Sequence, residues 1–161
     1  MFRELADKAK TKIVCQLDHA TSEKECETAV NEGFTSVMFD GSALNLNENI
    51  KQTLSVCNLI RKHDVSVEAE LGFVGYSNSS KSSLTNPDEA KIFVEQTKID
   101  ALAVSIGNVH LQKRQQNNIN LDLLKEIEQK TSCPLVLHGS SGISYKSCLL
   151  YTSDAADEWI G

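Results

Sequence analysis

Three of the four histidines in this 161-residue chain lie directly after short β-rich runs of sequence. His19 follows KIVCQLD, His110 follows ALAVSIGNV, and His138 follows PLVL. Two further runs end in carboxylates, since Asp40 follows SVMF and Glu70 closes VSVEAE. Three neutral imidazoles with an open fourth position form a catalytic Zn²⁺ site, and carboxylate oxygens also bind metals. The residue types therefore indicate metal chemistry, provided that the fold brings them together.

The sequence between these residues alternates β-rich runs with amphipathic helical patterns. The predicted strands are Lys12–Leu17, Ser36–Phe39, Val65–Glu70, Ala101–Ile106 and Pro134–Leu137. Strand and helix alternating about every 30 residues is typical of βαβ units, which form a parallel sheet. Because parallel strands end at one edge of their sheet, the five side chains are expected to converge there. One histidine after a strand is more often structural, so the inference rests on all five residues together.

The predicted helices have recognisable ends. Ser22 and Glu25 form a capping box, and Gly33 stands where a helix-terminating glycine belongs. Asn86 and Pro87 are typical of an N-cap and the first helical position. The other helical patterns cover Ile50–Lys62, Ala90–Thr97 and Leu121–Ile127. This α/β order fits either an open doubly wound sheet or a piece of a (β/α)₈ barrel, which needs about 250 residues.

Composition excludes several classes of protein. The net charge is −6, and no basic patch for nucleic acid occurs. The apolar runs are only a few residues long, so the sequence contains no membrane span and no secretory signal. The five cysteines include no CxxC pair, which favours buried thiols in a reducing compartment over disulfides or a zinc ribbon. We therefore expect a cytoplasmic protein with a small-molecule partner and neither nucleic acid nor membrane.

Two smaller features could complete a site at the strand ends. Asp18 directly precedes His19; neighbouring side chains diverge in an extended strand, but at a strand end both can reach one pocket. A carboxylate there that is not a ligand is a candidate proton donor and acceptor, although a turn or cap role is equally open. Gly139, Ser140 and Ser141 follow the last predicted strand. Small residues leave backbone N–H groups free to bind a phosphate.

Two stretches stand apart from the βα pattern. Tyr76–Thr85 is rich in Ser and Asn and is predicted to be a loop, either at the active site or on an idle surface. The run CLLYTSDAADE (Cys148–Glu158) resembles the translation of a sequencing-library adaptor, with a native acidic tail as the alternative. We exclude it from the fold as one excludes a fusion scar. One domain is thus expected over residues 1–147, with a non-native tail over 148–161.

Five motifs occur in order along the chain. They are QLDHAT (Gln16–Thr21), GFTSVMFDGS (Gly33–Ser42), VSVEAELG (Val65–Gly72), IDALAVSIGNVH (Ile99–His110) and PLVLHGSSGI (Pro134–Ile143). In this order they resemble the class II, zinc-dependent fructose-bisphosphate and tagatose-bisphosphate aldolase family, from about Ile13 to Ile143. The resemblance implies an α/β fold that is a partial (β/α)₈ TIM barrel. Its five consecutive βα units would match strands 3 to 7 of that family.

The resemblance also implies an activity in carbohydrate metabolism, such as glycolysis. Members cleave a ketose 1,6-bisphosphate into dihydroxyacetone phosphate and an aldehyde phosphate, or run the condensation. Zinc is expected to stabilise the enediolate, so that no lysine Schiff base is required. In the match, Asp18 is the catalytic acid and base. The matched zinc ligands are His19, His110 and His138. A second metal position, for a divalent or monovalent cation, matches Asp40 and Glu70. The substrate phosphate matches Gly139, Ser140 and Ser141, with the backbone of Leu111 as a further candidate.

The chain departs from the family at specific places. Leu111 stands where the family usually has glycine, and Ser140 replaces the second glycine of its HGG run. The match also lacks the family's first two strands and its last. We therefore expect a fragment of an enzyme that is a homo-oligomer at full length, and an isolated chain without activity. The alternatives are a catalytically idle relative that binds metal or sugar phosphate, and another metal-dependent α/β lyase.

Overall fold

One parallel sheet organises the computed structural model, which describes residues 2–75, 82–110, 119–139 and 143. Its strands are β1 (Gln16–Ala20), β2 (Ser36–Phe39), β3 (Ser66–Leu71), β4 (Ala101–Val104) and β5 (Leu135–Val136). Its helices are α1 (Phe2–Lys8), α2 (Glu23–Asn31), α3 (Leu46–Ile60), α4 (Pro87–Thr97) and α5 (Leu121–Lys130). The strands lie in the order β1-β2-β3-β4-β5, and all neighbours are parallel. The prediction of five parallel strands adjacent in chain order is confirmed.

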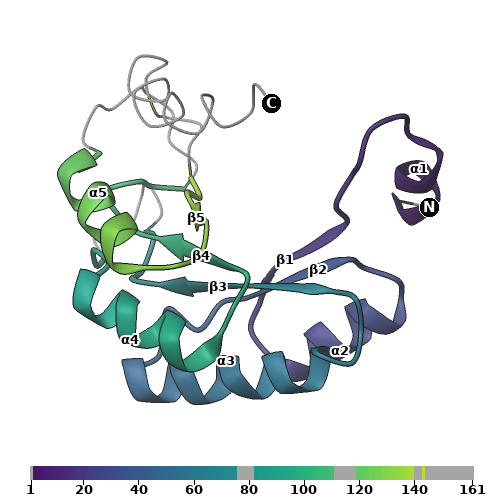
Figure 1. The fold of residues 1–161 in the computed structure, drawn as a ribbon, viewed down its shortest axis with the longest axis horizontal. Helices are drawn as coiled ribbons and strands as arrows, with labels where there is room; N and C mark the ends of the chain where they lie inside the picture. The colour runs from purple at the N-terminus through teal and green to yellow at the C-terminus, as the bar shows by residue number, and fades with distance from the viewer. Residues whose placement is uncertain (1, 76–81, 111–118, 140–142, 144–161) are drawn as a thin grey trace.

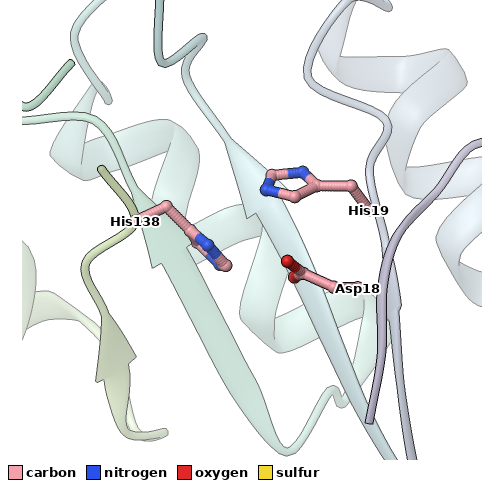
Figure 2. Close-up of side chains that lie close together, drawn as sticks. All are labelled: Asp18, His19 and His138. Atoms are coloured by element: carbon pink, nitrogen blue, oxygen red, sulfur yellow. The ribbon is translucent and has the colours of Figure 1, made fainter. Parts of the chain in front are cut away.

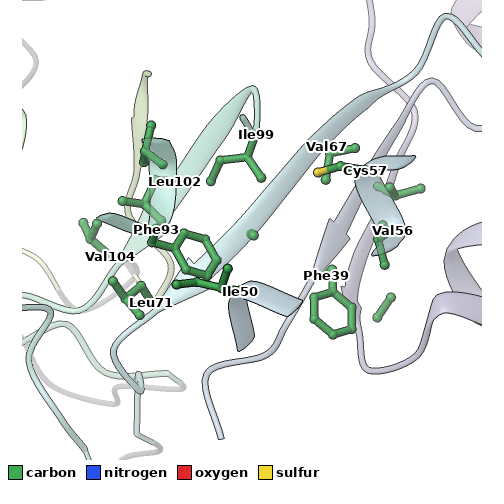
Figure 3. Close-up of a cluster of buried hydrophobic side chains, with 14 of the residues drawn as sticks. Phe39, Ile50, Val56, Cys57, Val67, Leu71, Phe93, Ile99, Leu102 and Val104 are labelled. Carbon is green, nitrogen blue, oxygen red and sulfur yellow. The ribbon is translucent and has the colours of Figure 1, made fainter. Parts of the chain in front are cut away.

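The two faces of the sheet have different roles. Figure 1 shows α2 to α5 along one face, with α1 standing apart. Side chains on that face pack against the helices, as Phe39 and Leu102 do in the core that contains Val56 and Phe93 (Figure 3). Because side chains alternate along a strand, the residues between them point to the opposite face, called here the inner face. The inner face carries polar side chains at buried positions of β3, namely Glu68 and Glu70.

The first strand was predicted wrongly. Lys12–Leu17 was expected, whereas β1 covers Gln16–Ala20, and Ile13 and Val14 are exposed. Two β-branched residues carried the sequence signal, but pairing with β2 starts only where Gln16 lies opposite Ser36. His19 therefore belongs to the strand rather than following it.

The fourth strand is shorter than the predicted Ala101–Ile106. It ends at Val104 because the next residues make hydrogen bonds outside the sheet. The backbone N–H of Ser105 donates to Thr85 Oγ1 at 2.8 Å, and that of Ile106 donates to Asn108 Oδ1 at 2.8 Å. The predicted loop Tyr76–Thr85 is described only from Ser82, and an antiparallel bridge joins Ser83 to Phe73.

The helix ends follow the predicted caps in two cases. Ser22 and Glu25 form the capping box of α2, and Asn86 accepts from two backbone N–H groups of α4. The predicted helix Ile50–Lys62 instead spans Leu46–Ile60, because the side chain of Asn45 accepts from the N–H of Glu48 and starts α3 earlier. No helix in the described ranges is long and apolar enough to cross a membrane.

The cysteines agree in part with the expectation of buried thiols. Cys26 and Cys57 are buried and free, whereas Cys15 and Cys133 are half-buried and free. Cys148 and the whole predicted tail lie outside the described residues.

Candidate active site

A bulge in β1 turns two consecutive side chains toward the inner face. Leu17 pairs with Val37 and Ala20 pairs with Phe39, so β1 has one more residue than β2 over this interval. The backbone accommodates the extra residue at His19, which has a φ of +51°. A bulge changes the direction of a side chain without ending the strand. Asp18 and His19 can therefore both reach one site, although neighbours in a regular strand would diverge.

The three predicted zinc-binding histidines form one cluster at the carboxyl edge of the sheet. The ring centroids of His19 and His138 lie 4.7 Å apart, and those of His19 and His110 lie 5.4 Å apart. The centroids of His110 and His138 are 6.3 Å apart. Asp18, His19 and His138 each offer one ligand atom, and these atoms lie within 4.8 Å of one another. Figure 2 shows the side chains of Asp18, His19 and His138 pointing toward a common space.

His110 lies beside this group but not in it. Among the described residues, two groups of side chains have ligand atoms within 4.8 Å of one another, the one above and a second that also contains His19. His110 belongs to neither group. Burial lowers the pKa of His110, and the charges of His19 and His138 lower it further. Its backbone N–H donates to the carbonyl of Gly75 at 2.9 Å, which ties the loop after β4 to the loop after β3.

Asp40 and Glu70 form a second group with His19. Oδ2 of Asp40 is 2.8 Å from Nδ1 of His19, and Oε2 of Glu70 is 3.9 Å from the same nitrogen. The structure thus brings together the pair predicted as a second metal position, in one group with His19. The backbone N–H and the hydroxyl of Ser42 also hold Asp40, both donating to Oδ1.

Burial and hydrogen bonding separate the titration of these two carboxyls. Burial would raise the pKa of Asp40, but the hydrogen bonds from His19 and Ser42 outweigh it and hold the pKa at about 2. Burial raises the pKa of Glu70 to about 7, and the nearby charge of Asp40 adds to the effect. The hydrogen bond to Asp40 raises the pKa of His19.

Glu68 is a site residue that the sequence reasoning missed. Its Oε1 lies 2.8 Å from Nε2 of His138, and this contact raises the pKa of His138. The signal was present in the sequence, because Glu68 stands two residues before Glu70 and must point to the same face of β3. The sequence offered no reason to expect a side chain of β3 to contact a residue that follows β5.

Asn108 is a second missed residue. It is 3% exposed, and its Nδ2 donates to the carbonyl of His138 at 2.8 Å. Gly139 follows His138 with a φ of +65°, and a Cβ there would lie 2.7 Å from the carbonyl of Val109. The segments that carry His110 and His138 therefore pack directly against each other. Of the predicted phosphate-binding residues, Gly139 is described, whereas Leu111, Ser140 and Ser141 lie outside the described residues.

The donor set fits a metal ion. His19 has one ring nitrogen next to Asp40, and His138 has one next to Glu68, which leaves the second nitrogen of each as a candidate ligand atom. Oε2 of Glu70 is buried and has no hydrogen-bond partner among the described residues. A buried carboxylate oxygen without a partner is costly, and a cation would satisfy it.

Comparison with known proteins finds aldolases among the relatives of this chain. The sequence pattern of the family described as "Fructose-bisphosphate aldolase class-II" matches residues 1–152. The chain is 40% identical over 134 residues to 6-phospho-5-dehydro-2-deoxy-D-gluconate aldolase of Shouchella clausii, covering 81% of this chain and 46% of that one. It is 40% identical over 144 residues to fructose-bisphosphate aldolase of Ureaplasma parvum, covering 87% of this chain and 49% of that one.

The fold also resembles that of a solved aldolase structure. The crystal structure of the YdjI aldolase from Escherichia coli K12 matches with a TM-score of 0.77 and 36% identity, over 89% of this chain and 50% of that one. The structural neighbours are class II aldolases with TIM-barrel folds, so the five βα units correspond to part of such a barrel. The chain spans about half the length of the curated relatives that it matches.

Proposed function

Because the chain belongs to the class II fructose-bisphosphate aldolase family, we propose that it contributes most of the catalytic centre of a metal-dependent aldolase. The reaction is the cleavage and condensation of a phosphorylated ketose. One observation carries the proposal: ligand atoms of Asp18, His19 and His138 lie within 4.8 Å of one another, with the ring of His110 beside them. The donor set is rich in imidazole, which suits zinc.

The proposed metal ligands are His19, His110 and His138. When bound, a divalent ion supplies Lewis-acid stabilisation of the negative charge that develops on the ketone half of the substrate. Asp40 contacts Nδ1 of His19 and so orients that ring, which leaves Nε2 as the candidate ligand atom. Asp40 and Glu70, which form one group with His19, are the proposed position for a second cation.

Asp18 is the proposed acid and base. It is exposed at the site, so it can contact a substrate. In cleavage its carboxylate accepts the proton of the hydroxyl on the carbon that becomes the aldehyde, and in condensation it returns a proton to that oxygen. Gly139, Ser140 and Ser141, together with the backbone at Leu111, are the proposed phosphate contacts.

Two substrates fit this chemistry. A ketose 1,6-bisphosphate is the first, in line with the relative named fructose-bisphosphate aldolase. The second is 6-phospho-5-dehydro-2-deoxy-D-gluconate, favoured by relatives of that name at 40% and 41% identity. Both compounds carry a ketone next to a phosphorylated carbon. They differ at the far end of the chain, where one has a second phosphate and the other a carboxylate.

The test uses the full-length protein that contains these residues. The purified protein is assayed for cleavage of both compounds, then stripped of metal with a chelator and assayed again after addition of Zn²⁺. We expect cleavage of at least one compound, loss of activity with the metal, and recovery with Zn²⁺. Activity that persists after elemental analysis has shown the metal to be gone would contradict the proposal. Metal and sugar-phosphate binding without cleavage would instead identify the catalytically idle relative.

A further inference from the structure

A series of hydrogen bonds crosses the inner face of the sheet and ends at His138. The hydroxyl of Ser36 donates to Oε1 of Gln16 at 3.0 Å, and Nε2 of Gln16 donates to Oε2 of Glu68 at 3.0 Å. The other oxygen of Glu68 lies 2.8 Å from Nε2 of His138. The four side chains come from β2, β1, β3 and the residue after Leu137, and they span residues 16 to 138.

The order of donors and acceptors in this series defines where the proton of His138 lies. An ionised carboxylate only accepts hydrogen bonds, so Glu68 requires a donor at each oxygen. Gln16 can supply one donor because its carbonyl oxygen is turned toward the hydroxyl of Ser36. The other donor must be Nε2–H of His138. A neutral imidazole has one N–H, so its lone pair is then at Nδ1.

We propose that Glu68 is a positioning residue that holds His138 as the Nε2–H tautomer and presents Nδ1 to the metal. This inference rests on the proposed function, in which His138 is a metal ligand. Carboxylates commonly hold metal-binding histidines through the other ring nitrogen, which orients the ring and raises its basicity. Asp40 holds His19 in the same way but at Nδ1, so the two histidines present opposite nitrogens.

The sheet geometry explains how Glu68 reaches a residue beyond β5. Glu68 pairs with Ala101 on β4, the strand that lies between β3 and β5. Paired residues of neighbouring strands point to the same face, so β4 presents only a methyl group there. The longer side chain of Glu68 can pass over it.

Burial makes this contact matter. The side chain of Glu68 is 7% exposed, and that of His138 is 15% exposed. Water therefore offers little replacement for a lost partner, and the ring of His138 loses its orienting contact when Glu68 is changed. Changes in such carboxylate partners typically cost about 10–100-fold in metal affinity.

The first measurement is the affinity of the full-length protein for Zn²⁺, by competition with a chromophoric chelator. Glu68→Gln keeps the size of the side chain and removes its charge. We expect it to weaken Zn²⁺ binding by about 10–100-fold. Gln16→Ala removes one donor to Glu68 and should weaken binding by a smaller factor. Glu95→Gln makes the same chemical change as Glu68→Gln at an exposed position of α4, and should leave the affinity unchanged.

The second measurement separates positioning from a general effect on folding. ¹⁵N-histidine NMR of the Zn²⁺-loaded protein reports which ring nitrogen of His138 keeps its proton, and correlation of the ring signals with the sequentially assigned backbone identifies His138. We expect Nε2–H with Nδ1 on the metal in the unmodified protein. In Glu68→Gln, the Nε2–H signal should shift or broaden, while the far-UV circular dichroism spectrum of the metal-free protein should match that of Glu95→Gln and so show that the variant is folded. A metal bound through Nε2 would overturn the proposal, as would an unchanged affinity in Glu68→Gln.

These outcomes are independent of catalysis. A protein that binds Zn²⁺ through Nδ1 of His138 but cleaves neither sugar phosphate would refute the proposed function and leave the role of Glu68 intact. An active aldolase in which Glu68→Gln changes neither affinity nor the tautomer signal would refute the role of Glu68 alone.

Discussion

Asn108 and His138 connect the loop after β4 to the end of β5. Nδ2 of Asn108 donates to the backbone carbonyl of His138 at 2.8 Å and to that of Val104 at 3.3 Å, while its Oδ1 accepts from Ile106. One buried amide thus joins the segments that carry two of the three clustered histidines. The geometry of the cluster depends on this link as well as on the strands.

Replacing Asn108 should therefore destabilise the protein and loosen the site. Asn108→Ala leaves the buried N–H of Ile106 and the half-buried carbonyl of His138 without this partner, and a buried group of this kind costs about 1–3 kcal/mol. We expect a clear fall in the denaturation midpoint of the full-length protein and weaker Zn²⁺ binding. Asn58→Ala, at an exposed asparagine whose side chain accepts a hydrogen bond from Arg61, is the matched control. Equal midpoints for the two variants would contradict the structural role of Asn108.

A methyl group at Gly139 should disturb the site more than backbone strain alone. Alanine at positive φ costs roughly 1–2 kcal/mol at any position. At Gly139 the new Cβ would also lie 2.7 Å from the carbonyl of Val109 and 3.0 Å from the nitrogen of His110. Gly139→Ala should therefore lower both the denaturation midpoint and the bound metal.

Gly33→Ala is the control for strain. Gly33 has a φ of +88°, but the nearest atom to its new Cβ is Cγ of Arg3 at 4.0 Å. We expect Gly33→Ala to lower the midpoint without changing the metal content. If both variants retain metal equally, the contact between the two histidine-bearing segments is not important for the site.

Alanine substitutions at Asp18 and at His110 should separate proton transfer from metal binding. Asp18→Ala should keep Zn²⁺ near stoichiometric and reduce turnover by about 10²–10⁴, the usual contribution of a positioned acid or base. His110→Ala should lose metal and activity together, since two imidazoles cannot hold a three-ligand site tightly. Zinc content and kcat of the full-length variants are the measurements.

The controls for these substitutions lie at the amino ends of the strands, away from the histidine cluster. His63 and Asp64 are exposed and precede β3, so His63→Ala and Asp64→Ala should change neither quantity. The geometry offers a specific alternative for Asp18, whose oxygen lies within 4.8 Å of ligand atoms of His19 and His138. Loss of zinc in Asp18→Ala would make Asp18 a ligand or a structural support and refute its proposed role as acid and base.

The isolated 161-residue chain should fold poorly. Within the part of the chain that is described, β1 pairs only with β2 and β5 only with β4, so the sheet has two edges. Unpaired edges and uncovered apolar surface favour aggregation. We expect largely insoluble or molten protein with negligible cleavage, measured by size-exclusion chromatography, dye binding and assay. A soluble monomer at high concentration with a cooperative thermal transition would contradict this expectation.

The sequence by itself determined the parallel arrangement of the strands and most of the residues at their carboxyl ends, whereas the order of the strands was implied only by the resemblance to the aldolase family. Alternating β-rich and helical patterns require parallel neighbours, and parallel neighbours bring His19, Asp40, Glu70 and His138 to one edge. Local capping signals such as that of Ser22 and Glu25 were also readable, because a cap involves residues only three positions apart. These features depend on neighbours along the chain.

Only the tertiary structure decided how the side chains meet. The bulge that lets Asp18 and His19 point to one site depends on the register between β1 and β2, which the residues of β1 alone do not reveal. The early end of β4 depends on Thr85, a residue of the preceding loop. The contact between Glu68 and His138 joins residues 70 positions apart across a strand that presents alanine. Periodicity reports which face a side chain occupies, but the partner it finds there depends on packing between distant segments.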